Sequence, residues 1–175
     1  MLRGVLEEYP TENLERVVRS ATPTLPADTI VSTTLASFDE DNVHALWQKA
    51  LSRRDSDPAG AITIARTLLE EVCKHVIDNA GQSYSEKDEL PKLYRTAAEC
   101  LKLAPDQHTE DIFRRILGGC QTVVEGLGAI RNKLSDAHGQ GPNPARPTGR
   151  HAALAVNLAG AMATFLVATW TERNP

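Results

Sequence analysis

The segment from Thr148 to about Glu172 limits the possible folds most, because it is apolar on nearly every side. Its larger apolar residues are Leu154, Val156, Leu158, Met162, Phe165, Leu166 and Trp170. A helix with so little polar surface has to be enclosed, either by other helices or by lipid. Because Asn157 and several small residues interrupt the run, we interpret it as the central helix of a bundle and expect no membrane span.

The remainder of the chain also follows a helical period. Apolar residues recur at i, i+3 and i+4 over about 39–54, 58–79, 90–103 and 109–137, and segments rich in Gly, Pro and polar residues separate these stretches. Asp57 and Pro58 have the residue types of an N-cap and a first helical position, and Gly81 predicts the end of that helix. The sequence shows no strand alternation. We therefore predict an all-α, up-and-down bundle of four to five helices.

Residues 1–36 differ from this pattern, so we divide the chain into an N-terminal accessory arm at 1–36 and a helical domain at 37–175. Pro10, Pro23 and Pro26 interrupt the arm, leaving a short amphipathic segment at Thr11–Ser20 and a brief extended piece at Ile30 and Val31. A partly ordered tail and a segment for docking or dimerisation both fit this composition.

Charge and cysteine content narrow the function classes. The net charge of -4 argues against a protein that coats nucleic acid with its whole surface. Residues 129–151, however, hold four Lys or Arg against one Asp, a local excess of +3. The three cysteines have no metal-ligand spacing, so we expect no metal and no other cofactor, and unpaired thiols suit a reducing cytoplasm. The first residues contain no apolar run typical of a signal peptide.

Arg131 and His138 break the pattern of the helix predicted at 109–137. At about 100° per residue, one stripe of that helix collects Phe113, Ile116, Leu117, Cys120, Val124, Leu127 and Leu134. Arg131 and His138 fall on the same stripe. A permanent charge on a core-facing line is costly unless it is paired or lies at a cleft. A functional site explains this conflict, but so does a plain helix end, with Arg131 beside the dipole and Gly139 as the stop.

Further cations surround this position. Arg146 lies in the loop after His138, and Arg150 and His151 lie in the first turn of the last helix, where backbone N–H groups attract anions. Lys74 lies outside the apolar stripe of its helix and is a weaker candidate for a phosphate contact. For all of these residues, a solvated surface position is the simpler alternative.

The stretch from about Ala65 to Trp170 resembles the abortive-infection C-terminal domain, a branch of the HEPN superfamily of prokaryotic defence and toxin proteins. The resemblance is carried by the segments 66–74, 90–94, 118–120, 126–139 and 150–152. HEPN nucleases are marked by an Arg, a polar residue and a His after four to six intervening residues. Arg131, Asn132 and His138 meet this pattern. A Tyr that some members carry two residues after the His is replaced here by Gln140.

The resemblance implies a metal-independent endoribonuclease, used as a toxin or anti-phage effector, that works as a homodimer with both Arg–His pairs in one cleft. It assigns proton transfer to His138, stabilisation of the charged phosphorane to Arg131, and orientation to Asn132. Further RNA contacts are expected from Ser135, Lys133, Arg146, Arg150, His151 and Lys74. RNA and a second copy are the expected partners, and an antitoxin or other defence protein is a further candidate. A non-catalytic module that binds RNA or protein, and a structural dimerisation domain, remain alternatives.

Overall fold

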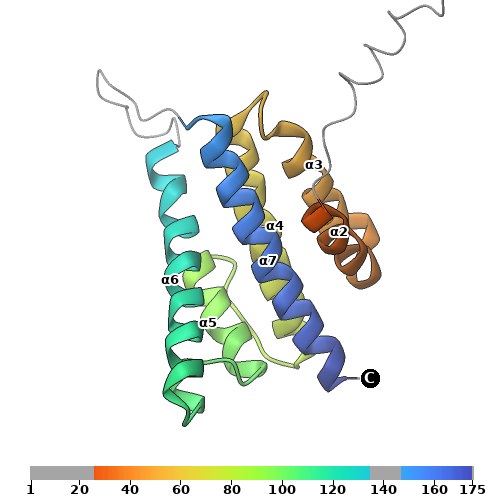
Figure 1. Ribbon diagram of the computed structural model, residues 1–175. Helices are drawn as coiled ribbons and strands as arrows, with labels where there is room; N and C mark the ends of the chain where they lie inside the picture. The colour runs from red at the N-terminus through yellow and green to blue at the C-terminus, as the bar shows by residue number, and fades with distance from the viewer. Residues whose placement is uncertain (1–25, 135–146, 175) are drawn as a thin grey trace, which may run out of the picture.

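The computed structural model describes residues 26–134 and 147–174, and over these residues the chain is helical without strands (Figure 1). The helices are α2 (Pro26–Phe38), α3 (Ala45–Arg53), α4 (Pro58–Asn79), α5 (Leu90–Cys100), α6 (Asp111–Leu134) and α7 (Gly149–Arg173). A π turn (Glu40–His44) precedes α3, and a 3-10 turn (Pro105–Gln107) precedes α6. The predicted all-α bundle is confirmed.

The long helices α4 and α7 pack against each other at the centre, with α3 and α2 on one side and α5 and α6 on the other (Figure 1). α7 is long and apolar enough to cross a membrane, but half of its most apolar 18-residue stretch is buried inside the protein. Ala152, Val156, Ala159, Ala163 and Leu166 of this helix are all completely buried. The expectation of a central core helix is therefore supported.

The ends of α4 follow the local sequence. The Asp57 carboxylate accepts a hydrogen bond from the Gly60 N–H at 3.0 Å, which satisfies a backbone donor in the first helical turn. After the helix, Gly81 adopts a φ of +68°, a left-handed conformation that glycine accepts without penalty. The N-cap at Asp57, the Pro58 start and the stop at Gly81 are confirmed as predicted.

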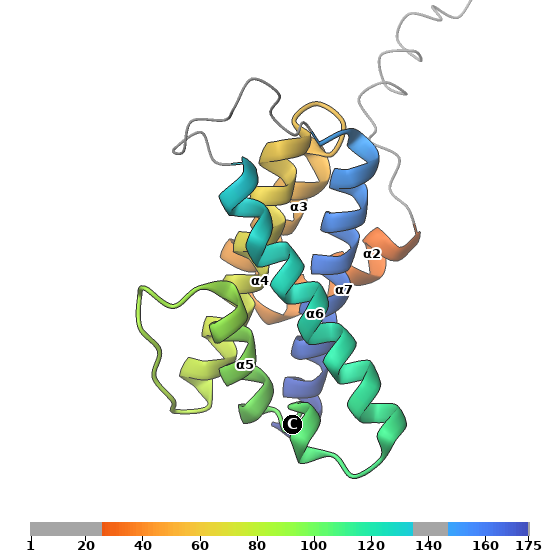
Figure 2. The ribbon, with the colours of Figure 1, turned by 90° about the vertical axis from the view of Figure 1, so that its left-hand side faces the viewer.

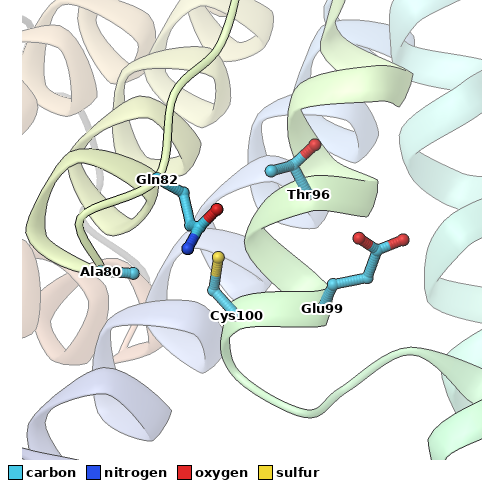
Figure 3. A pocket seen from close by; sticks show the side chains of 5 residues that line it. All are labelled: Ala80, Gln82, Thr96, Glu99 and Cys100. Atoms are coloured by element: carbon cyan, nitrogen blue, oxygen red, sulfur yellow. The ribbon is translucent and has the colours of Figure 1, made fainter.

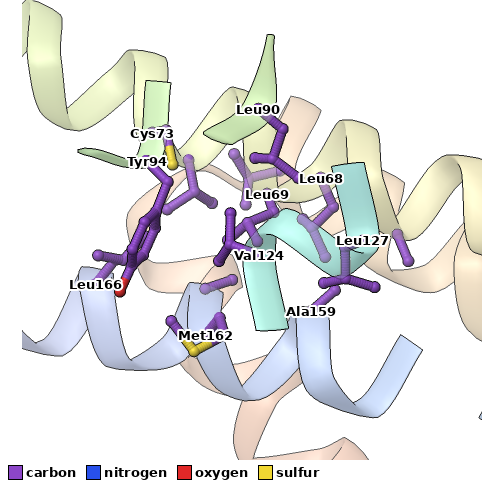
Figure 4. Packing of buried hydrophobic residues seen from close by; sticks show 14 of the residues in the cluster. Leu68, Leu69, Cys73, Leu90, Tyr94, Val124, Leu127, Ala159, Met162 and Leu166 are labelled. Atoms are coloured by element: carbon purple, nitrogen blue, oxygen red, sulfur yellow. The ribbon is translucent and has the colours of Figure 1, made fainter. Parts of the chain in front are cut away.

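α5 runs parallel to α4, because the loop between them returns along the bundle before α5 begins (Figure 2). α6 then runs back antiparallel to α4 and α7. A Cβ at Gly128 of α6 would lie 3.1 Å from Pro91, so α6 passes close to the first turn of α5. Figure 4 shows side chains of these four helices meeting in one core, among them Leu69, Tyr94, Val124 and Leu166.

The expected extended piece at Ile30 and Val31 is wrong, since both residues lie in the helix α2. Tertiary contacts outweigh the β preference of these residues: Leu35 is completely buried and Val31 packs against the core. The Asp28 carboxylate also pairs with the Arg54 guanidinium at 2.9 Å, with both side chains buried. Residues 26–36 of the predicted arm are thus part of α2, whereas residues 1–25 lie outside the described residues.

Candidate functional site

The predicted site residues belong to one end of the bundle. The C-terminal end of α6 and the N-terminal end of α7 lie together there (Figures 1 and 2). The loop that connects α3 to α4 lies at the same end. A Cβ at Gly149, the first residue of α7, would lie 2.8 Å from the carboxylate of Asp55 in that loop. We call this the site end of the bundle.

The backbone of α6 places position 131 on the buried line of the helix. Leu117, Val124 and Leu127 on that line are buried, with exposed fractions of 6%, 0% and 3%. Position 131 follows Val124 by seven residues and Leu127 by four, so it shares their direction. The predicted stripe is wrong at its beginning, because Phe113 and Ile116 are more than half exposed and lie where α6 has no helix covering them.

The central predicted residues are described only in part. Arg131, Asn132 and Lys133 belong to the helical backbone of α6, and nothing is described of their side chains. Ser135, His138 and Arg146 lie outside the described residues. Their assigned roles therefore stay predictions.

The first turn of α7 has two predicted cations with different surroundings. The Nδ1 atom of His151 accepts a hydrogen bond from the Thr148 backbone N–H at 3.1 Å, and the Thr148 hydroxyl lies 3.0 Å from the same atom. His151 therefore caps its own helix, and in its neutral form it keeps the proton on Nε2. Arg150 is exposed and forms no ion pair within the described part of the chain. Arg150 is thus available to an anion at a helix N-terminus.

Lys74 is not brought to the site end. Its Nζ atom lies 2.8 Å from a Glu71 oxygen, and this hydrogen bond raises the Lys74 pKa. At a rise of about 1.5 Å per residue, Lys74 lies about 24 Å along α4 from Pro58, which is near the site end. Its contact with RNA would require a substrate that extends well beyond Arg131.

Sequence reasoning missed an ion pair on α4. The Arg66 Nη2 atom lies 2.7 Å from Glu70 Oε1, and the two side chains are 8% and 17% exposed. The Arg66 Nε–H has no hydrogen-bond partner although it is buried. The signal was present in the sequence, because Arg66 continues the apolar line of Ile62, Leu69 and Cys73, the same conflict that Arg131 shows.

A cavity of about 350 Å³ lies away from the site end, between the C-terminal ends of α4 and α5 (Figure 3). Ala80, Gln82, Thr96, Glu99 and Cys100 line it. Burial, followed by the nearby Glu99 charge, raises the Cys100 pKa, so this thiol stays protonated and is a poor nucleophile. The cavity contains no set of groups suited to acid–base chemistry.

α6 and α7 also expose apolar side chains at regular spacing. On α6, exposed or half-buried residues with small or apolar side chains follow at intervals of four and three: Ile112, Ile116, Gly119, Val123 and Gly126. On α7, the same spacing gives Leu154, Leu158, Ala161, Phe165 and Ala168. This is the spacing by which one helix packs along another. We call these two rows the outer stripes of α6 and α7.

Comparison with known proteins identifies a family for this chain. The family model Abi_C, described as an HEPN-like domain, matches residues 41–170. This range includes α3 to α6, most of α7 and the candidate site, and it leaves out α2. No curated protein and no solved structure matches the chain.

Proposed function

The chain belongs to the HEPN-like Abi_C family, and on this premise we propose that it is a metal-independent endoribonuclease acting as a toxin or abortive-infection effector. The observation that carries the proposal is position 131 on the buried line of α6, at an end of the bundle that also presents Arg150. An arginine on an apolar helix line has no packing purpose that an apolar residue would not serve better.

The proposed reaction uses a nucleophile that RNA itself contains. His138 takes the proton of a ribose 2′-OH, the 2′-oxygen forms a bond to the adjacent phosphorus, and the bond to the 5′-oxygen breaks. A proton passes to the departing 5′-oxygen, leaving a 2′,3′-cyclic phosphate. Arg131 stabilises the extra negative charge of the phosphorane through its planar donor fork. DNA has no 2′-OH and is not a substrate by this route.

The remaining predicted residues assist in binding. Asn132 orients the phosphate or the imidazole, and Lys133 and Ser135, two and four residues after Arg131 in the sequence, contribute further contacts. Arg150, and Arg146 in the preceding loop, bind neighbouring phosphates, which agrees with the local excess of positive charge at 129–151. We propose that this reaction takes place in the cytoplasm, where three free thiols are stable. An antitoxin or another defence protein is the further partner we expect.

We also propose that the active form is a homodimer. The outer stripes of α6 and α7 support this, because side chains such as Ile112, Ile116 and Leu154 are at least 56% exposed in a single chain. A Cβ at Gly119 or Gly126 would meet nothing within 4 Å, so a second helix has room to approach α6 closely. Packing about a two-fold axis along the bundle would bring both site ends together.

Cleavage of a mixed RNA in EDTA tests the proposal, with wild type, Arg131→Ala and His138→Ala compared. We expect wild type to cut and to leave 2′,3′-cyclic phosphate ends, and both variants to lose activity. A 2′-deoxy version of the same oligonucleotide should stay intact. Equal behaviour of the three proteins, or RNA that is bound without being cut, would replace the nuclease with a binding module.

A further inference from the structure

The Arg66–Glu70 pair is unusual for a pair that serves packing alone. Arg66 is a permanent charge with a side chain only 8% exposed, yet it makes one short bond and leaves its buried Nε–H without a partner. Each buried donor without a partner destabilises a fold, so an efficient core would use an apolar residue at this position. The pair therefore calls for a role outside packing.

The position of the pair on α4 follows from its neighbours. Cys73 lies in the buried core close to Tyr94 of α5 (Figure 4), and Cys120 of α6 packs against the same core; both thiols add to the burial that raises the Tyr94 pKa. Glu70 lies close to this line as well, since its charge adds to the burial that raises the Cys73 pKa. Arg66 precedes Cys73 by two helical turns on the same line, in the direction of the site end.

α6 carries a matching line. Cys120, Leu127 and position 131 follow one another at intervals of seven and four, so they share one face of α6. α4 and α6 are antiparallel (Figure 2), so the site end lies toward the N-terminus of the α4 line and toward the C-terminus of the α6 line. Leu127 of α6 and Leu68 and Leu69 of α4 belong to the same buried core (Figure 4), and position 131 follows Leu127 by one turn.

The Arg66 and Glu70 side chains extend along α4 toward the level of position 131 on α6. The Cα–Cβ bonds of a helix tilt toward its N-terminus. On α4 this tilt carries the Arg66 and Glu70 side chains toward the site end. Position 131 of α6 lies one turn beyond Leu127 toward the site end, so the Arg66 and Glu70 side chains extend toward the level at which the backbone of position 131 lies.

We propose that Glu70, held by Arg66, is the counter-ion that orients the Arg131 guanidinium. Glu70 and Arg66 are then positioning residues: Glu70 fixes the fork of Arg131 in the direction of the scissile phosphate, and Arg66 fixes Glu70. The catalytic part of this inference rests on the proposed ribonuclease, whereas the Glu70–Arg131 pairing does not.

A double-mutant cycle on thermal stability tests the pairing without any assay of activity. We expect the melting-temperature losses of Glu70→Gln and Arg131→Gln to sum to more than the loss of the double variant, because each single change removes the same interaction. The matched control is Glu71→Gln, which removes the neighbouring carboxylate that pairs with Lys74. The melting-temperature loss caused by Glu71→Gln should add to the loss caused by Arg131→Gln. If Glu70→Gln does not fold, Glu70→Asp takes its place in the cycle. Additive losses for the position-70 variant overturn the pairing.

Cleavage of a short mixed RNA tests the positioning role. We expect Glu70→Gln to lower kcat about tenfold or more while KM changes by less than about twofold, since substrate binding is kept and orientation is lost. In the Arg131→Gln background the same change should have no further effect on residual cleavage. An equal loss in both backgrounds means a structural role only and overturns the positioning role. If wild type does not cut RNA, the proposed function fails, and the stability cycle still decides the pairing.

Discussion

Replacing Arg54 by Met should destabilise the protein strongly, because it removes the cation that the Asp28 carboxylate faces. The Arg54 Nη2 atom lies 2.9 Å from Asp28 Oδ2, and Nη1 lies 3.4 Å from Oδ1. The two side chains are 8% and 2% exposed, so water screens the pair little. Met keeps much of the Arg54 stem, and what is lost is mainly the charge.

The expected loss follows from the burial of both groups. Removing one partner of a buried pair costs about 3–5 kcal/mol, because the other charge stays in a poorly solvated place. For a chain of this size, about 1 kcal/mol corresponds to about 2–4 °C, so the melting temperature should fall by about 6–20 °C. Differential scanning calorimetry at neutral pH measures this directly.

The adjacent residue supplies the control. Arg53 also pairs with an aspartate, Asp57 at 3.4 Å, but both side chains are nearly half exposed. Arg53→Met should therefore cost no more than about 0.5 kcal/mol. The double variant Asp28→Leu, Arg54→Met should recover most of the loss, since two apolar residues replace the pair. If Arg54→Met melts within 2 °C of Arg53→Met, the pair does not anchor α2 as argued.

Three further predictions concern glycines and thiols. Gly160→Ala should cost about 1–3 kcal/mol in urea unfolding, because its Cβ would lie 2.7 Å from the buried Trp47 ring, whereas Gly118→Ala, with open space and outside the outer stripe of α6, should gain about 0.5–1 kcal/mol. Gly81→Ala should cost about 1–2 kcal/mol in the same assay for its φ of +68°, and a neutral result would contradict the left-handed turn. Burial raises the Cys73 pKa above its ordinary value of 9.0, so the unfolded chain alone releases this proton and stability falls as the pH rises past about 9. Cys73→Ala should flatten that alkaline loss, and parallel stability–pH curves for variant and wild type would argue against it.

The helices that could be predicted from sequence are those with local signals. Asp57, Pro58 and Gly81 mark both ends of α4, and Thr148 marks the start of α7. α2 was not predictable in this way, because Pro26 and the β-branched Ile30 and Val31 disfavour a helix locally. Its helix depends on the buried pair with Arg54 and on packing against α7, which are contacts distant in sequence.

The candidate site was predictable to the extent that it lies on one helix face. Counting along α6 located Arg131 on the line of Leu117, Val124 and Leu127, and the backbone agrees. The same count could not indicate that Phe113 and Ile116 lie beyond the neighbouring helices. It also gave no partner for Arg131, because α4 meets α6 only in the tertiary structure and Glu70 had the pattern of a solvated residue.

The two buried arginines of the described residues illustrate how packing and function can be told apart. Arg54 donates to both Asp28 oxygens and reaches Asn157 at 3.5 Å, so its fork is well used and it joins three segments of the chain. Among the described residues, Arg66 forms one ion pair, with Glu70 of its own helix, and its buried Nε–H has no partner. Local ion pairs of that kind stabilise little, and burial makes this one costly. Stability alone would therefore keep Arg54 and replace Arg66, which is why we assign Arg66 and Glu70 to the site.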